Sequence, residues 1–306
     1  MVPDWFLARL GWKTPDPEST KAKDVCRRAF GHEAGRECGP NLADLNGASS
    51  TFIAGEIYRL LGISPAVTRD FDLGELELED TEPESGDAAV PTSEGITLEK
   101  GLESEIRETL DSAEPLRRWY VTRKDVAHDF AQFAHMQRFE QLAASDAMKE
   151  LRKEFPEFLA SLPRDYNGKS DVMVGLPDPT DDSKRLLHAV VSSKLTLRSD
   201  RAQNVRTEFG VLIRNRRGRL PHLVVVTAEP LPSRLESLTR GTGEIDANYH
   251  LLFEVMDQAI NNLVSRTDLP SPTLTGLTKQ AIKWREMVDG GRMRPYSTLI
   301  ETLRRT

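Results

Sequence analysis

Apolar residues recur at helical spacing through the first half of the chain. Residues 49–63 (SSTFIAGEIYRLLGI) begin with Ser and Thr and reach a glycine after the last apolar turn, which predicts a helix with a glycine stop. The same spacing predicts helices over 98–113 and 125–145, and a further helix over 147–162 that bends or splits at Pro156. We expect the apolar face of the 125–145 helix to be buried; its residues are Phe130, Phe133, Met136 and Leu142.

The pattern changes after residue 170, where short continuous apolar runs replace the helical spacing. Residues 170–176 (SDVMVGL), 186–197 (LLHAVVSSKLTL) and 222–229 (HLVVVTAE) are rich in β-branched residues. Runs of this length and composition are typical of strands buried on both faces of a sheet. We therefore predict three neighbouring central strands.

Helical segments connect and follow these strands. Ser199 is a good N-cap and Gly218 lies beyond the last apolar turn, so a helix is expected between the second and third strands. A late helix is predicted over 248–265, and residues 1–45 are expected to form loops with short helices. No repeat or interdomain linker is visible, so the predicted fold is α/β, a central mixed β-sheet flanked by helices, in a single domain over 1–306.

Charge is distributed unevenly along the chain. The net charge is −7 over 306 residues, but residues 70–114 hold sixteen Asp/Glu against two Lys/Arg, whereas 184–240 hold twelve Lys/Arg against four Asp/Glu. The acidic stretch around 70–95 is expected to be an exposed, mobile loop. The basic region indicates a phosphate-bearing partner, although two solvated faces of opposite sign are an equal alternative on charge alone.

Composition also limits the compartment. No apolar stretch approaches the roughly 18 residues of a membrane span, and charge and proline interrupt the N-terminal apolar patch, so neither a membrane span nor a signal peptide is expected. Cys26 and Cys38 are too few for a disulfide framework, and together with His32 they match no standard zinc spacing. These features predict a cytoplasmic protein.

Candidate chemistry lies at the ends of two of the predicted strands. Asp171 begins the first strand and Lys194 lies near the end of the second, so a carboxylate and an ammonium group meet if the strands are neighbours. Glu208 lies a little over two turns into the following helix and can reach the same point. Carboxylate oxygens bind Mg²⁺, and a lysine can orient water or balance phosphate charge, so the set is typical of a metal-dependent phosphodiesterase. Each residue alone is more commonly a strand-edge or cap residue.

The segment LLHAVVSSKLTLRSDRAQNVRTE, continued by NRRGRLPHLVVVTAEPLPSRLESLTRGTGEID, closely resembles type II restriction endonucleases of the NgoMIV type, within the CCGG-cutting group. The resemblance is dense over about 186–260 and weaker through DYNGKSDVMVG, AQFAHM and ADLNGASSTFIAGEIYRLL. It implies a restriction-endonuclease-like core, Mg²⁺ as the cofactor and double-stranded DNA as the partner.

Five residues take active-site roles by this resemblance. Lys194 matches the catalytic lysine and Glu208 an acid relocated from the position of Ser192, where many nucleases keep it. Asp171 matches the metal-binding aspartate, although Ser170 stands where the family usually has proline. A further active-site acid is matched by Glu103, and a main-chain carbonyl facing the metal by Ser193.

Five other residues take base-reading roles. Arginine suits guanine and aspartate suits cytosine in the major groove, so the alternating Arg198, Asp200 and Arg201 fit a run of G·C pairs, which the resemblance implies is CCGG. Arg234 and Asp44 match the residues that read an outer G·C pair. The expected target is GCCGGC, cut after the first G to leave a 5′ CCGG overhang.

A palindromic target requires two-fold protein symmetry, so we expect a homodimer or homotetramer. Two other functions stay open. A DNA-binding regulator would need the reading cluster of Arg198, Asp200 and Arg201. It would have no need of the catalytic residues Asp171, Lys194 and Glu208 together. A repair or recombination nuclease directed by DNA structure would need the catalytic residues but not the reading cluster.

Overall fold

The computed structural model describes most of the chain. The described residues are 2–30, 38–65, 98–137, 170–197, 199–241 and 243–305, with the backbone alone at 199–201. The predicted acidic loop and the helix predicted over 147–162 lie outside these ranges.

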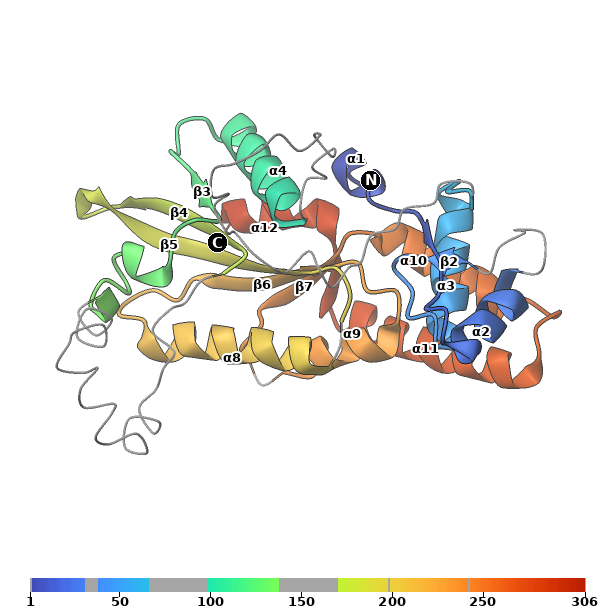
Figure 1. The fold of residues 1–306 in the computed structure, drawn as a ribbon. Coiled ribbons are helices and arrows are strands. Elements are labelled where there is room, and N and C mark those ends of the chain that lie inside the picture. Colours follow the sequence, from blue (N-terminus) through green and yellow to red (C-terminus); the bar gives the residue numbers. More distant parts are fainter. Residues whose placement is uncertain are drawn as a thin grey trace, which may run out of the picture.

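A six-stranded sheet forms the centre of the molecule (Figure 1). In spatial order its strands are β3 Tyr120–Thr122, β4 Val172–Asp178, β5 Asp181–Lys194, β6 His222–Thr227, β7 Ala247–His250 and β8 Met293–Pro295. The β3, β4 and β5 strands pair antiparallel, whereas β5 to β8 pair parallel. The mixed sheet confirms the predicted fold class.

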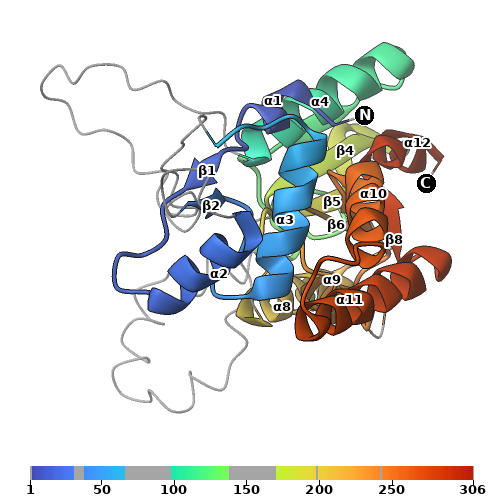
Figure 2. The same cartoon turned by 90° about the vertical axis from the view of Figure 1, so that its right-hand side faces the viewer.

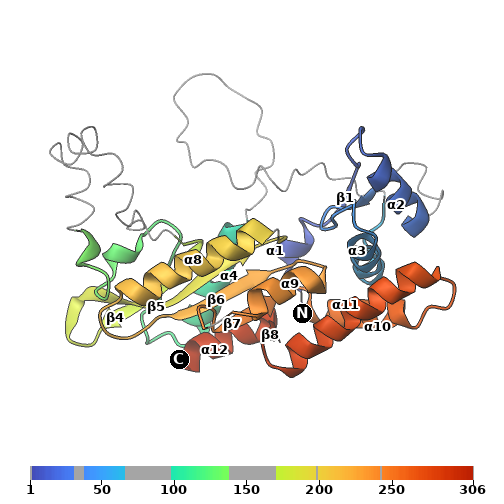
Figure 3. The ribbon, with the colours of Figure 1, turned by 90° about the horizontal axis from the view of Figure 1, so that it is seen from below.

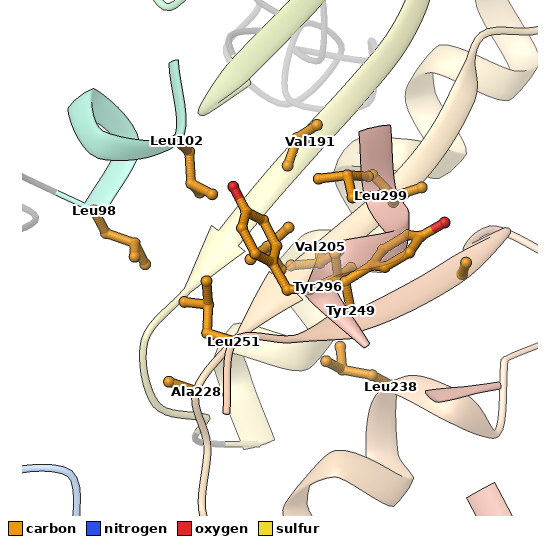
Figure 4. Packing of buried hydrophobic residues seen from close by; sticks show 14 of the residues in the cluster. Leu98, Leu102, Val191, Val205, Ala228, Leu238, Tyr249, Leu251, Tyr296 and Leu299 are labelled. Carbon is orange, nitrogen blue, oxygen red and sulfur yellow. The ribbon is translucent and has the colours of Figure 1, made fainter. Parts of the chain in front are cut away.

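The central strands are buried because helices cover both faces of the sheet. Residues 187–193 of β5 and 223–227 of β6 are buried without alternation, as expected for parallel strands in an α/β fold. Figures 1 and 3 show α8 (Ser199–Asn215) and α9 (Pro232–Thr239) along one face, and α4 (Leu98–Ala113) and α12 (Leu299–Arg305) on the other. In Figure 4, side chains from these helices gather around the strands; they include Leu102, Val205, Leu238 and Leu299 beside Val191 and Tyr249.

A helical group lies beyond one end of the sheet. It contains α2 (Thr20–Phe30), α3 (Ala48–Leu60), α10 (Phe253–Val264) and α11 (Ser271–Asp289), and α3 packs against both α2 and α10 (Figure 2). The chain reaches this group through α1 (Asp4–Leu7) and the short pair β1 (Trp12–Lys13) and β2 (Gly39–Pro40). The group places residues from the N-terminal part of the chain beside the end of the sheet.

Most predicted elements are confirmed. The helix predicted over 98–113 has the bounds of α4, and α3 and α8 match two others. The glycine stop after α3 is Gly62, whose φ of 69° suits a residue without a side chain. The three predicted central strands are β4, β5 and β6. A single domain over the whole chain stays a prediction.

The helix predicted over 125–145 is wrong up to residue 135, and within the described part only residues 136–137 are helical. Residues 127–129 form a short 3-10 helix, and turns follow to residue 135. The Gln132 side chain accepts the Leu187 N–H and donates to the Leu187 carbonyl, both at 2.8 Å, so this segment docks on β5 instead of coiling. The predicted burial of Phe130, Phe133 and Met136 is confirmed; Leu142 lies outside the described residues.

The late helix predicted over 248–265 begins later than expected. Residues 247–250 form β7, which pairs with β6 and β8, and α10 begins at Phe253. Leu251 and Leu252 lie between the two elements and are buried in the core. Residues 1–45 contain an 11-residue helix, α2, as well as loops.

Candidate active site

The candidate site lies where the parallel strands end. Lys194 at the end of β5 is level with Thr227 of β6, which is level with His250 of β7. Because β4 runs antiparallel to β5, with Val172 opposite Val191, Asp171 enters the sheet at the same edge. In open α/β sheets, ligands bind at the carboxyl ends of the strands, so this edge is the expected place for chemistry.

The predicted meeting of Asp171 and Lys194 is found. The Lys194 Nζ lies 3.1 Å from Asp171 Oδ2, and the two side chains are 17% and 24% exposed. The same carboxylate oxygen accepts the Ser193 N–H at 2.5 Å and the Ser192 hydroxyl at 3.2 Å. The carboxylate is therefore held at a defined position yet stays partly open to solvent.

Glu208 extends from α8 toward the same point. Ser170 donates a hydroxyl hydrogen bond to Glu208 Oε1. The pKa of Glu208 is raised to about 7, mainly by burial and also by the nearby Asp171 carboxylate, whereas the hydrogen bond from Ser170 and the charge of Lys194 oppose the rise.

These groups fit a hard divalent cation. Two carboxylates that repel each other are stabilised when a cation binds between them, and oxygen ligands suit Mg²⁺. Asp171, Glu208 and the Ser193 main-chain carbonyl are the predicted ligands. Among the residues that the structure describes, no group of three or more His, Cys, Asp or Glu side chains is arranged to hold a metal ion, so such a site would need carbonyl or solvent ligands as well.

Glu103 is engaged elsewhere. From α4 its carboxylate pairs with Arg107 at 2.6 Å and with Arg123 at 2.8 Å. The role of Glu103 as a further active-site acid, besides Asp171 and Glu208, stays a prediction, and its carboxylate is paired with two arginines.

The predicted inner reading residues follow the site directly. Arg198 lies outside the described residues, and the same holds for the side chains of Asp200 and Arg201. The α8 backbone begins at Ser199, five residues after Lys194, so the start of this helix lies next to the candidate site.

The structure brings together the two predicted outer reading residues, which are 190 positions apart in sequence. Arg234 Nη2 forms an ion pair and hydrogen bond with Asp44 Oδ2. Their side chains are 29% and 34% exposed, so both remain partly accessible. An arginine and an aspartate side by side are the pair of groups that a single G·C pair satisfies.

Sequence reasoning missed three supporting residues. Ser170 contacts Glu208, and Ser192 contacts Asp171. Glu229 accepts the backbone N–H of Leu197, the residue directly before the inner reading residues. Nothing in the sequence distinguishes the two serines from others. Glu229 stands out only as an acid at the end of an otherwise apolar strand.

Two further expectations concern the cysteines and a membrane-spanning helix. Cys26 and Cys38 are both buried in the described part, and neither takes part in a disulfide; His32 lies outside that part. No helix within the described ranges combines the length and apolar character needed to cross a membrane.

The fold is a mixed β-sheet flanked by helices, as the sequence predicts for a restriction-endonuclease-like core. Its site joins an aspartate and a lysine from neighbouring strands with an acid from the next helix. Comparison with known proteins agrees. Residues 178–271 match the family model described as NgoMIV restriction enzyme. The chain is also 41% identical over 150 residues to the type II restriction enzyme NgoMIV of Neisseria gonorrhoeae, an alignment that covers 41% of this chain and 52% of that protein.

The predicted resemblance to restriction endonucleases of the NgoMIV type is thereby confirmed. The chain spans about half the length of the curated relative that it matches. Lys194, Glu208 and Arg234 lie inside the segment matched by the family model, whereas Asp171 and Asp44 lie outside it. The structure is thus what links those two residues to the matched segment.

Proposed function

We propose that this protein is a sequence-specific, Mg²⁺-dependent DNA endonuclease that cuts both strands of a CCGG-containing palindrome. One observation carries the proposal: Lys194 contacts Asp171 at the strand-end edge, with Glu208 close enough to interact electrostatically with both. The similarity to a type II restriction enzyme supports the same class.

The chain's own groups suit phosphodiester hydrolysis. The Lys194 ammonium group can orient an attacking water or balance charge on the scissile phosphate. Burial raises the pKa of the Glu208 carboxyl to about 7, so binding of a cation would favour loss of its proton. When bound by Asp171, Glu208 and the Ser193 carbonyl, Mg²⁺ would supply water activation and charge stabilisation.

The proposed target is GCCGGC, cut after the first G. Arg198, Asp200 and Arg201 would read the inner CCGG, and the adjacent Arg234 and Asp44 would read the outer G·C pair. Both reading groups then lie near the edge that carries the catalytic residues, so correct docking also places the scissile phosphate.

A palindrome presents the same sequence on each strand, so the working unit would have two-fold symmetry, as a homodimer or homotetramer. We place the protein in the cytoplasm, where its DNA substrate would be accessible. The late segment, with Leu251, Leu252, Val255 and Met256, is a candidate for either the subunit interface or the core. The core is favoured, because Leu251, Leu252 and Met256 are buried and Val255 is only partly exposed.

Digestion of a plasmid that contains GCCGGC sites, with and without Mg²⁺, tests the proposal. We expect discrete fragments only with the metal, and none from an Asp171→Ala variant purified in parallel as a control for contaminating nucleases. Binding without cleavage would favour a regulator. Nicking at branched or damaged DNA, with no preferred sequence, would favour a repair or recombination nuclease.

A further inference from the structure

Glu229 is a fully buried carboxylate at the same edge of the sheet. It follows β6 and is 0% exposed. A buried charge is costly unless hydrogen bonds satisfy it, so the partners of such a group are informative. None of the catalytic roles proposed above uses Glu229.

Its two carboxylate oxygens bind two different segments of backbone. Oε2 accepts the Leu197 N–H at 2.7 Å, and Oε1 accepts the Leu231 N–H at 2.9 Å. Leu197 directly precedes Arg198, the first inner reading residue, whereas Leu231 directly precedes α9, the helix that carries Arg234. One side chain therefore ties together the starting points of both reading groups.

Glu229 also faces the outer reading pair itself. Arg234 Nη1 lies 3.8 Å from Glu229 Oε2, while Nη2 of the same guanidinium bonds Asp44. The arginine is thus held between two carboxylates, one buried and one partly exposed. This arrangement restricts the guanidinium to the side where Asp44 is accessible.

The position of Glu229 is itself well determined. Its N–H donates to Thr227 Oγ1 at 3.1 Å, and its carbonyl contacts His250 Nε2 at 3.0 Å. Both partners belong to central strands, so the carboxylate is anchored to the rigid sheet and not to a loop.

We propose that Glu229 is a positioning residue for base reading, which fixes the backbone before Arg198 and the guanidinium of Arg234 in one frame so that inner and outer base pairs are read in register. The inference rests on the proposed function. It requires a carboxylate specifically, because each oxygen accepts a backbone N–H. A glutamine of the same shape would turn an NH₂ group toward one of those N–H donors.

The test measures relative affinities for three duplexes by fluorescence anisotropy, with Lys194→Ala in every protein so that bound DNA stays intact. The outer ratio compares GCCGGC with ACCGGT, and the inner ratio compares GCCGGC with GGCGCC. Ratios are insensitive to the fraction of protein that is folded, so a merely structural defect does not move them.

We expect Glu229→Gln to lower both ratios by about three- to tenfold. After Arg234→Ala, which removes the guanidinium that Glu229 faces, the Gln substitution should no longer change the outer ratio but should still lower the inner one. Glu236→Gln is the matched control, since this acid lies on α9 with Arg234 but pairs with Lys283 and Arg240. It should leave both ratios unchanged.

Glu229→Asp provides a second variant that keeps the charge but is too short to bridge Leu197 and Leu231, and it should lower the ratios in the same direction. If both variants bound with native ratios while the parent preferred GCCGGC, the role of Glu229 would be overturned and the proposed function would stand. A parent protein without preference for GCCGGC would overturn the proposed target, and the role of Glu229 with it.

Discussion

A single oxygen of Asp171 accepts hydrogen bonds from three consecutive residues at the end of β5, namely Ser192, Ser193 and Lys194. Two of these donors are neutral and one is charged. Under the proposed function, the neutral donors fix the carboxylate and the ammonium group acts on the substrate, so position and reactivity are supplied by different residues.

This division leads to a prediction for Lys194→Ala. The variant should lose cleavage while its affinity for the specific DNA site survives, because the lysine acts on the reacting phosphate and not on base edges. Gel-shift and cleavage assays on one duplex measure both. Loss of specific binding with intact cleavage would show that Lys194 has been assigned the wrong role.

Glu208→Gln provides a second residue-scale prediction. The amide keeps the shape and can still accept the Ser170 hydrogen bond, but it is a poor metal ligand, so cleavage should fall strongly with little change in folding. Single-turnover cleavage and thermal unfolding are the measurements. Full activity in the glutamine variant would remove Glu208 from the catalytic set.

Sequence reasoning found Asp171, Lys194 and Glu208 because strand ends and helix spacing place them at one edge. It could not find Ser170 or Glu229 in their supporting roles. Their hydrogen bonds join segments 38 and 32 positions apart, and only the packed fold determines which donors face a buried carboxylate. The pairing of Arg234 with Asp44 likewise depends on how the helical group docks on the sheet.

At the scale of elements, helices with strong apolar spacing were predictable, and short or docked segments were not. The α4 helix was predicted with its observed bounds, whereas the three-residue strands β3 and β8 carry too few residues to show a period. The turns after residue 130 have helical spacing, but hydrogen bonds between Gln132 and Leu187 override it.

Packing between α1 and α4 yields an element-scale prediction at Gly101. A Cβ built there lies 2.2 Å from Trp5 Cε3, and Trp5 is fixed by a 2.8 Å hydrogen bond to Glu105. Gly101→Ala should therefore lower the free energy of unfolding by about 1–3 kcal/mol despite the better helix propensity of alanine. Urea denaturation measures the change.

Gly210→Ala in α8 is the matched control. Its Cβ would meet only the guanidinium of Arg214, the far end of a flexible side chain, so propensity should dominate and stabilise the protein by about 0.5–1 kcal/mol. Equal effects at both glycines would contradict the close packing of α1 on α4.

At the scale of the whole molecule, buried titratable groups on the sheet oppose one another. Burial lowers the pKa of His188 to about 4 and that of His250 to about 4. The folded protein therefore loses the stability that each neutral histidine contributes as pH falls from 6.5 toward 4. Burial raises the pKa of Glu208 and of Glu229 to about 7. The folded protein therefore loses the stability that each neutral acid contributes as pH rises from 4.5 toward 7. Where the two pH ranges overlap, the changes in stability from the histidines and from the acids have opposite signs and offset each other.

Removing one histidine should expose this balance. Relative to the native protein, His188→Gln should gain about 1.4 kcal/mol in free energy of unfolding for each unit that pH falls between 6.5 and 4. His188 lies on β5, but its Nε2 contacts the Leu303 carbonyl of α12 at 2.7 Å, so the substitution tests the packing between β5 and α12. A variant that follows the native pH dependence would refute the buried neutral state of His188.

Sequencing the ends of genomic DNA digested with Mg²⁺ tests most directly the claim that one edge of the sheet both cuts and reads. We expect every end to carry a 5′ CCGG overhang with G immediately outside it, which reconstitutes GCCGGC on joining. Ends with A or T outside CCGG would contradict outer reading by Arg234 and Asp44. Ends without any common sequence would contradict the claim that the residues beside the catalytic edge select the site.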